Sequence, residues 1–510
     1  MFSVILIPLC LLVVIINYVF NYYQRSKLIS KYKCKPITQL PTKTILGKLG
    51  IDALFNQEKT KKSGTFHEDL YSTFKSLKTT TFQNTLLFQN QVMTIEPENI
   101  RLCTSSAHFN DWNIGWRSLA FEPLLGNGIF SSESGPKWKH SRMMLRPIFA
   151  KEHLKQITEM EQYTQSIIKI IKLKNGVSFD LQQLFNNFTI DYATNFLFGE
   201  SCDSLKDLLG EISTSTIDKD LKNSFAEAFN VSQDYLTKRA SLGPFMFLCN
   251  DSKFKEANKI QHEFVSYYVN KAINLSEKEL IDDSKSYTFL YQLAKQTNDP
   301  QVLQDELLNI LLAGRNTTAS LLSFLFFELA HNPKIFQKLK SEILKYYPDV
   351  NSITFESLQS CQYLKFVINE TLRYNPSVPI STRTASKLTI LPKGGGSDNE
   401  SPILIEKGTR IVFPLFVSNR NEKYFGERTN EFIPERWENL PANGGIAFMP
   451  FSTGPRLCLG QQFALIETSY LTIRFLQEFN QLEIVDDVYP PLKTANASMR
   501  LLDGCNVIFT

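Results

Sequence analysis

The chain has 510 residues, of which 43% are apolar and 21% are charged, a composition that is typical of a globular protein and excludes a disordered one. Its formal net charge of +4 is small for this length and does not indicate a nucleic-acid partner. The eight cysteines include no CxxC pair. A chain this long needs no disulfide staples, so we expect reduced thiols in a cytosol-facing protein.

The first 24 residues, MFSVILIPLCLLVVIINYVFNYYQ, carry no charged side chain. They are long enough to cross a bilayer as a helix, and they lack the basic start and the small-residue cleavage site of a secretory signal peptide. Tyr18, Tyr22 and Tyr23 lie at the far end, and five basic residues follow, as at a cytosolic membrane interface. The sequence therefore predicts a single-pass anchor over residues 1–24, then a basic, proline-containing connector over 25–60.

No linker divides residues 61–510, which we expect to form one mostly α-helical domain with a minor β portion. Residues 303–330 have the pattern of one long apolar helix that Asn332-Pro333 would end, and residues 334–346 and 360–374 have amphipathic helical patterns. The strand-like segments are short: residues 388–391, 403–405 and 410–413. A glycine-rich turn at 394–396 lies between the first two.

The segment FSTGPRLCLG, residues 451–460, places one cysteine in a frame of small and basic residues. Gly454 and Gly460 remove side-chain bulk where backbone must turn or come close, and Arg456 offers a fork of donors suited to a carboxylate. A helical pattern follows directly, so the sulfur of Cys458 lies just ahead of a helix N-terminus, where the dipole favours a thiolate. This frame predicts a metal-bound thiolate.

The same segment matches the heme-binding signature FxxGxRxCxG of cytochrome P-450 monooxygenases at every fixed position, so the chain resembles that family. The resemblance implies the cytochrome P-450 fold and a heme b whose iron has the thiolate of Cys458 as axial ligand, a ligand that favours O–O cleavage. Phe451, Gly454, Arg456 and Gly460 would contact the heme. The activity implied is that of a monooxygenase that uses O2 and takes electrons from NADPH-cytochrome reductase.

Three further residues match the proximal scaffold of the family. Glu370 and Arg373 form an ExxR pair on one helix face, and Arg436 lies in the motif PERW. Alone, such a pair is most often a solvated surface salt bridge. The resemblance implies instead a buried network of structural importance, because removing one partner would leave a buried charge unpaired.

Trp138 and Arg142 lie four residues apart on one predicted helix face, so that an indole N–H and a guanidinium can reach one carboxylate. By resemblance, these two residues and Arg383 bind the heme propionates together with Arg456; surface positions are the alternative. Lys137 and Lys139, beside Trp138, are candidates for docking an acidic reductase.

The segment AGRNTTA, residues 313–319, lies inside the long apolar helix and resembles the oxygen-activation segment of the family. Gly314 would let dioxygen approach the backbone, and the hydroxyl of Thr317 would direct protons. Asn316 stands where the family has Asp or Glu, and an amide cannot ionise at neutral pH. Proton delivery would then run through waters ordered by Thr317 and Asn316, or be slow and leak peroxide.

Longer stretches, among them ETLRYNPSVP, LPKGGGSDNESPILIEKGT and RLCLGQQFALIETSY, resemble the yeast alkane and fatty-acid hydroxylases. SNRNEKYFG departs from that pattern, so the chain would be a divergent member. The resemblance implies hydroxylation of the terminal carbon of an n-alkane or fatty acid at the endoplasmic reticulum membrane, with the catalytic domain in the cytosol. A sterol or a secondary metabolite is the alternative substrate, and a poorly active heme- and lipid-binding relic is the alternative protein.

A long apolar substrate would need an apolar wall that holds one chain end over the iron. Candidates lie near segments that line the pocket in this family, although plain core packing explains any one of them equally well. They are Trp112, Phe121, Leu125, Ile310, Ala313, Val378, Ile380 and Met499.

Overall fold

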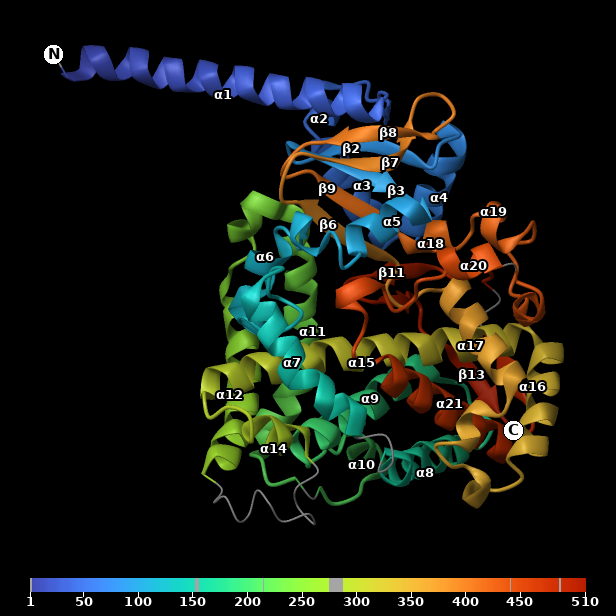
Figure 1. Ribbon diagram of the computed structural model, residues 1–510. Helices are drawn as coiled ribbons and strands as arrows, with labels where there is room; N and C mark the ends of the chain where they lie inside the picture. Colours follow the sequence, from blue (N-terminus) through green and yellow to red (C-terminus); the bar gives the residue numbers. More distant parts are fainter. Residues whose placement is uncertain (1, 152–155, 214, 275–287, 441, 486–487) are drawn as a thin grey trace.

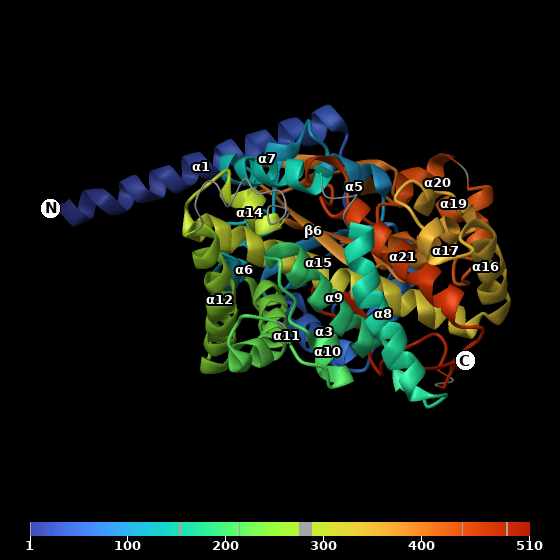
Figure 2. The same cartoon turned by 90° about the horizontal axis from the view of Figure 1, so that it is seen from below.

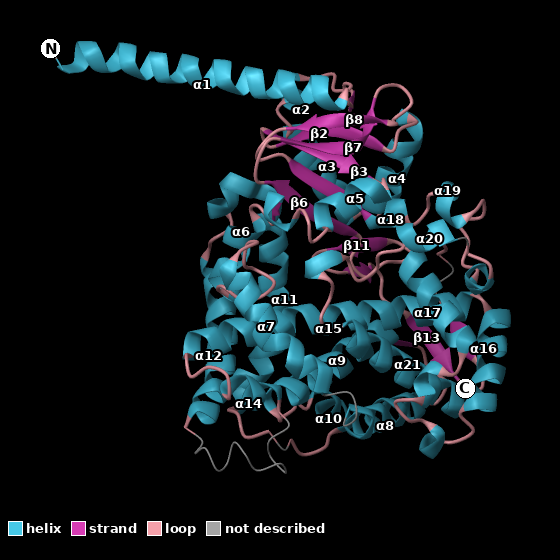
Figure 3. Cartoon of the chain, in the orientation of Figure 1, coloured by secondary structure: helices cyan, strands magenta, loops and turns pink. Residues whose placement is uncertain are grey.

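The computed structural model describes residues 2–151, 156–213, 215–274, 288–440, 442–485 and 488–510. Helices make up most of this part of the chain, and the longer strands gather at one end of the molecule (Figure 3). The expectation of a mostly helical protein with a minor β portion is confirmed.

The helices differ widely in length, and the longest are α1 and α15. They are α1 (Phe2–Tyr32), α2 (Ile45–Lys48), α3 (Ile51–Lys62), α4 (Phe66–Leu77), α5 (Pro97–Thr104), α6 (Arg117–Leu125), α7 (Pro136–Lys151), α8 (Gln156–Lys174), α9 (Leu181–Phe198), α10 (Ser204–Leu209), α11 (Lys219–Leu242), α12 (Ser252–Ile273), α14 (Phe289–Ala294), α15 (Pro300–His331), α16 (Pro333–Tyr346), α17 (Gln362–Tyr374), α18 (Leu415–Ser418), α19 (Glu422–Phe425), α20 (Ala442–Ala447) and α21 (Gln461–Glu478).

The largest sheet has the strand order β1-β2-β3-β9-β6-β4. In it β6 pairs with β9 in antiparallel register, with Thr384 opposite Arg410. The strands are β1 (Thr38–Gln39), β2 (Thr81–Leu86), β3 (Gln89–Thr94), β4 (Trp112–Asn113), β5 (Phe179–Asp180), β6 (Ile380–Ala385), β7 (Thr389–Gly395), β8 (Ser401–Ile405), β9 (Arg410–Pro414), β10 (Leu482–Ile484), β11 (Lys493–Ala495), β12 (Met499–Leu501) and β13 (Asn506–Phe509).

Helix α15 runs through the middle of the molecule (Figures 1 and 2). Asp299 caps its start by accepting hydrogen bonds from the N–H groups of Gln301 and Val302, and the helix ends before Pro333. The predicted helix over 303–330 is confirmed. Within the described residues, α15 is the helix long and apolar enough to cross a membrane, but it is mostly buried inside the protein, so it is a core helix.

The core around α15 is built from aromatic side chains of three helices. Phe326 packs on Phe185 of α9 at a ring-centroid distance of 5.5 Å and on Phe475 of α21 at 5.1 Å. Burial of one such side chain contributes about 1.5–3 kcal/mol. These contacts fix α15 against α21, the helix that follows Cys458.

Helix α1 extends away from the rest of the molecule (Figures 1 and 2), and its apolar residues from Leu12 to Phe20 are exposed where they are described. It continues to Tyr32, beyond the predicted end of the anchor at residue 24. Within the expected connector, β1 pairs with β2 in parallel, and α2 and α3 follow. Neither residue 24 nor residue 60 is the end of an element, and the three-part division of the chain remains a prediction.

The glycine-rich segment 394–396 is not simply a turn. Gly394 and Gly395 belong to β7, and Gly395 pairs with Ser401 after a register shift. A Cβ atom on Gly394 would lie 2.6 Å from the Cβ of Thr81, and one on Gly395 would lie 2.8 Å from the backbone oxygen of Lys35. The first two residues of the predicted turn are thus strand, because only glycine lets these backbones approach so closely.

Candidate active site

The loop that carries Cys458 is held against α5. Gly454 has φ +68°, and a Cβ atom there would lie 1.8 Å from the backbone oxygen of Thr104, so only glycine fits. The N–H of Cys458 donates to the oxygen of Phe451 at 3.0 Å, which folds the loop back on itself. Gly460 precedes the first residue of α21. The structure therefore places Cys458 just before a helix N-terminus, on a loop with a fixed path.

The side chain of Cys458 has accessible surface, yet the protein around it is dense. Loss of solvation raises the pKa of its thiol, while a hydrogen bond from the Gly460 backbone and the charge of Arg142 act in the opposite direction. Together these observations place the sulfur at an enclosed space. A metal cation on the sulfur would favour the thiolate.

Three of the predicted cofactor contacts lie together beside this loop. Trp138 of α7 is buried, with the guanidinium of Arg456 4.9 Å and that of Arg142 5.6 Å from its ring centroid. Arg142 donates to the backbone oxygen of Leu457 at 3.0 Å, and Arg456 donates to that of Ser132 at 2.9 Å. Helix α7 and the cysteine loop are thereby joined.

Two more arginines, the buried Arg383 and the half-buried Arg117, add charge to this group. Burial, followed by the charges of Arg117 and Arg383, lowers the pKa of Arg456 to about 8, and Glu133 is the one acid that opposes this shift. Burial and the charges of Arg383 and Arg410 lower the pKa of Arg117 to about 9. The Nε atoms of Arg117 and Arg456 are buried without a partner among the described residues. Among the described residues, the charges that act on these arginines come mostly from other arginines. Arg117, at the start of α6, belongs to no motif in the sequence, so sequence reasoning missed it.

On α15, Ala313 is exposed although Leu311 and Leu312 before it are buried, which indicates an open space beside the middle of this helix. A Cβ atom on Gly314 would meet nothing within 4 Å. The hydroxyl of Thr317 donates to the oxygen of Ala313 at 2.8 Å. These residues line the side of α15 that borders this space, and their role in oxygen activation stays a prediction.

Asn316 has a partner that the sequence does not reveal. Its amide Nδ2 donates to Oε1 of Gln233 on α11, a buried residue whose own Nε2 has no partner among the described residues. The amide of Asn316 therefore faces α11, while the hydroxyl of Thr317 bonds within α15. The side chains that sequence reasoning assigned to one proton-handling pair have separate partners.

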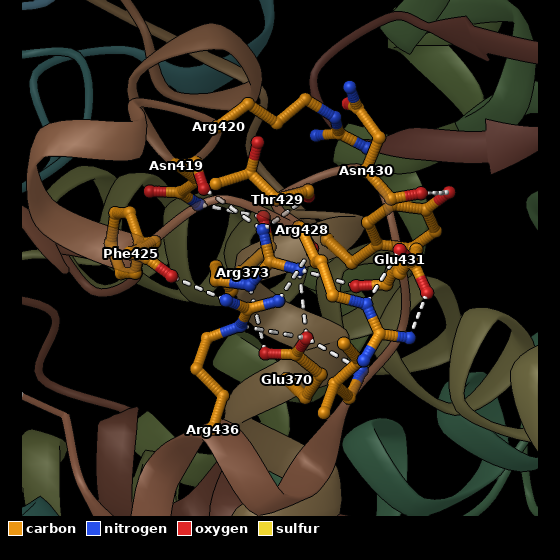
Figure 4. A network of polar contacts seen from close by, with 12 residues as sticks. Glu370, Arg373, Asn419, Arg420, Phe425, Arg428, Thr429, Asn430, Glu431 and Arg436 are labelled. Carbon is orange, nitrogen blue, oxygen red and sulfur yellow. Dashed lines mark hydrogen bonds and ion pairs between the residues drawn. The ribbon is translucent and has the colours of Figure 1, made fainter.

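Figure 4 shows the group around Glu370. Glu370 and Arg373 of α17 are both fully buried, and Arg373 donates to both carboxylate oxygens at 2.8 Å. The Nε of Arg436 lies 3.4 Å from a carboxylate oxygen of Glu370, and the indole N–H of Trp437 donates to the other oxygen of that carboxylate at 3.0 Å. Arg373 also donates to the backbone oxygens of Asn419, Thr429 and Glu431. The predicted trio lies together and joins α17 to the segment 419–437.

A family model of cytochrome P450 matches residues 50–502 of this chain. The chain is 57% identical to Cytochrome P450 52C2 of Candida maltosa over 492 residues, which is 96% of each protein. It is 49% identical to Cytochrome P450 52C1 of Candida tropicalis over 490 residues, again 96% of each. The chain belongs to the cytochrome P450 family. It is accordingly a heme-thiolate monooxygenase that works with a reductase, O2 and a lipophilic substrate.

The residues beside Cys458 fit the P450 heme. The Nε atoms of Arg117 and Arg456 are buried donors without a described partner, and loss of solvation lowers the pKa of both side chains, which at Arg456 only Glu133 opposes. The heme propionates are carboxylates of the kind that a guanidinium binds best. Trp112 Nε1, another buried donor without a described partner, belongs to a strand just before Arg117.

The predicted substrate-wall residues divide by exposure. Ala313 is exposed, and Ile310, Val378 and Ile380 are half-buried, as residues beside an open space would be. The others are buried in the core: Trp112, Phe121, Leu125 and Met499. For these four, core packing accounts for what the structure shows.

Proposed function

We propose that this P450 hydroxylates the terminal carbon of an n-alkane or fatty acid, with electrons from NADPH-cytochrome reductase, and that Cys458 is the axial ligand of its heme iron. The observation that carries the substrate class is the near full-length similarity to yeast members of the family. The sequence motifs resemble those of the yeast alkane and fatty-acid hydroxylases. The geometry around Cys458 supports the assignment of the ligand.

The bound heme supplies the oxidising chemistry, and the protein supplies position and protons. Arg117, Arg383 and Arg456, with Trp138 and Arg142, would hold the propionates by charge-assisted hydrogen bonds. Gly314 leaves room beside α15. The Thr317 hydroxyl can pass a proton by exchanging its bond to Ala313 for one to a water or to the oxygen substrate. The amide of Asn316 carries no acidic proton at neutral pH, so protons must reach Thr317 from water.

Terminal hydroxylation requires that one end of a long chain is held in place. Each buried methylene contributes about 0.8 kcal/mol, which stabilises a chain laid along an apolar wall. Ile310 and Ala313 of α15 and Val378 and Ile380 around the start of β6 supply accessible apolar surface for it. Their exposure supports this proposal.

The membrane location rests on two exposed apolar surfaces. The first is α1, proposed as the anchor in the endoplasmic reticulum membrane, with the basic residues from Arg25 onward on the cytosolic side. The second, the apolar patch, lies on α2, α3, the β2–β3 turn and the short 3-10 helix Gly243–Leu248 after α11. The ring centroids of Phe88, in the turn, and Phe245, in the 3-10 helix, are 6.0 Å apart. The exposed members of the patch are Ile45, Leu46, Phe55, Phe88, Phe247 and Leu248. Exposed patches of this kind mark contact surfaces.

Turnover by membranes that contain the protein, its reductase and NADPH tests the proposal. Mixed long-chain fatty acids and alkanes are supplied, with a sterol in a separate assay, and hydroxylated products and hydrogen peroxide are measured together. Terminal alcohols with little peroxide support the proposal. Products from a sterol alone, or NADPH consumption that yields only peroxide with every substrate, would contradict it.

A further inference from the structure

A pocket of about 550 Å³ lies between α6, the β2–β3 turn and the adjoining ends of β6 and β9, at the edge where α6 meets the sheet (Figure 1). Trp116 and Leu119 line one side and are exposed, and Thr384 and Arg410 line the other. Trp116 also lies within 3.5 Å of a Cβ built on Gly243, beside the apolar patch. The pocket thus has an apolar rim next to the surface that we propose meets the membrane, and a cation inside.

Arg410 has no ion pair or side-chain hydrogen bond with any described residue. Burial alone lowers its pKa to about 10. Other cations lie close: its charge lowers the pKa of Lys61 and of Arg117. Of the two acids of the pocket, Glu406 pairs with Arg25 at 2.5 Å, which leaves the charge of Glu133 against those of Arg410 and Lys407. The pocket therefore offers a positive potential to an anion.

Strand β6 leads from this pocket into the protein. Thr384, Thr382 and Ile380 on one face are half-buried, whereas on the other face Arg383 and Ala385 are buried and only Ser381 is half-buried. The accessible face spans about 13 Å from Thr384 to Ile380 at the usual rise per residue. It is polar beside Arg410 and apolar at Ile380. This is the polarity of a carboxylate followed by an alkyl chain.

We infer that Arg410 binds the carboxylate of a fatty-acid substrate, whose alkyl chain lies along the accessible face of β6 with its far end toward α15. The inference rests on the proposed function and deepens it, because an n-alkane has no group for Arg410. Arg410 would be a specificity-determining residue that selects the acid over the alkane and leaves the terminal carbon as the end that reaches the heme.

Binding of hexadecanoic acid and of hexadecane to the full-length holoenzyme tests this inference. The Kd of each is measured from the change in the heme Soret band, and kcat/KM from product formation. Arg410→Gln is expected to raise the Kd for the acid about tenfold or more, as for loss of a charge-assisted hydrogen bond, and to leave the Kd for the alkane unchanged. Arg410→Lys keeps the charge and should restore most of the affinity for the acid.

Arg500→Gln is the matched control, because Arg500 is also a strand arginine but is exposed and lies outside the pocket; both Kd values should stay at the wild-type level. If Arg410→Gln changed the Kd values for the acid and the alkane equally, or changed neither, the inference would be overturned. Turnover of both substrates by the wild-type protein would in that case still support the proposed function. A wild-type protein that binds neither ligand would remove the proposed function itself.

Discussion

Asn316 stands where the resemblance to the P450 family leads one to expect a carboxylic acid, and its amide bonds to Gln233 of α11. A carboxylate at this position could accept from Gln233 only if that amide turned, which would satisfy the Nε2 atom that now lies buried without a described partner. The site therefore has the donors to receive an acid. We therefore expect the neutral residue to change proton supply next to Thr317 and to leave the fold unchanged.

Asn316→Asp is expected to lower the peroxide formed per NADPH severalfold and to raise product yield, because an ionisable group then stands beside Thr317. Coupled measurement of NADPH, peroxide and product checks this. Asn230→Asp is the control, since Asn230 lies on α11 near Gln233, the partner of Asn316, but bonds to Arg315 instead. Unchanged peroxide in Asn316→Asp would show that the amide does not limit proton delivery.

For single residues, the sequence predicted the position of a site residue where a motif keeps the residues of that site close in the chain. Cys458, Gly454 and Arg456 share one loop, so their proximity follows from spacing alone. Arg117, Gln233 and Arg410 belong to no motif. Their importance comes from burial and from neighbours on other elements, which local sequence does not encode.

Two crossings of elements contain buried carboxyl groups and decide how the heme end of the fold is held. At the first, Glu370 receives hydrogen bonds from Arg373, Trp437 and the N–H of Ile433. At the second, α15 meets α21, where Glu467 and Thr318 are both buried and share a hydrogen bond. The first is an ion-paired crossing and the second a neutral one, so they respond differently to substitution and to pH.

Glu370→Gln is expected to destabilise the protein by about 3–5 kcal/mol, because Arg373 and Arg436 would remain buried without a counter-charge. Urea unfolding of the holoenzyme, followed by the Soret band and by circular dichroism, measures the loss. In the control Glu431→Gln the broken pair with Arg428 is exposed, so a change below about 1 kcal/mol is expected. Equal effects of the two variants would contradict a buried structural role for Glu370.

Burial raises the pKa of Glu467 from 4.5 to about 8, so the folded state keeps a proton that the unfolded state loses. Stability is then fully present below about pH 4.5 and falls as the pH rises toward 8, by at most about 1.4 kcal/mol per pH unit. Glu467→Gln, which cannot ionise, should flatten this slope in urea unfolding measured between pH 5 and 8.

Glu483→Gln provides the comparison, since Glu483 is an exposed carboxylate on β10, and it should keep the wild-type slope. If Glu467→Gln unfolded with the same pH dependence as the wild type, the carboxyl of Glu467 would have to be ionised in the folded state.

As a whole molecule, the protein presents its exposed apolar surfaces on α1 and on the apolar patch, and α1 leaves the body close to the sheet that borders the Arg410 pocket (Figure 1). A lipophilic substrate partitions into the bilayer. A pocket that opens beside a membrane-facing patch would receive such a substrate without its passing through water.

Removal of residues 2–32 is expected to leave part of the protein bound to microsomal membranes, because the apolar patch remains. Adding Phe247→Ser and Leu248→Ser to the truncated chain should release it, as measured by sedimentation in high salt. The same two substitutions in the full-length chain should leave it bound. A truncated chain found wholly in the supernatant would show that the patch does not touch lipid.

The sequence by itself determined the central helix, the cysteine loop and the ExxR pair, because each depends on hydrophobic periodicity, end signals or spacing within a few residues of chain. It also determined the family, through a motif that is fixed by the geometry of one ligand. Only the tertiary structure decided that Asn316 faces Gln233, that Arg117 joins the arginines beside Cys458, and that Arg410 stands in a pocket with no ion-pair partner among the described residues. The physical reason is that burial, desolvation and charge neighbours arise where distant segments cross, and no local pattern records those crossings.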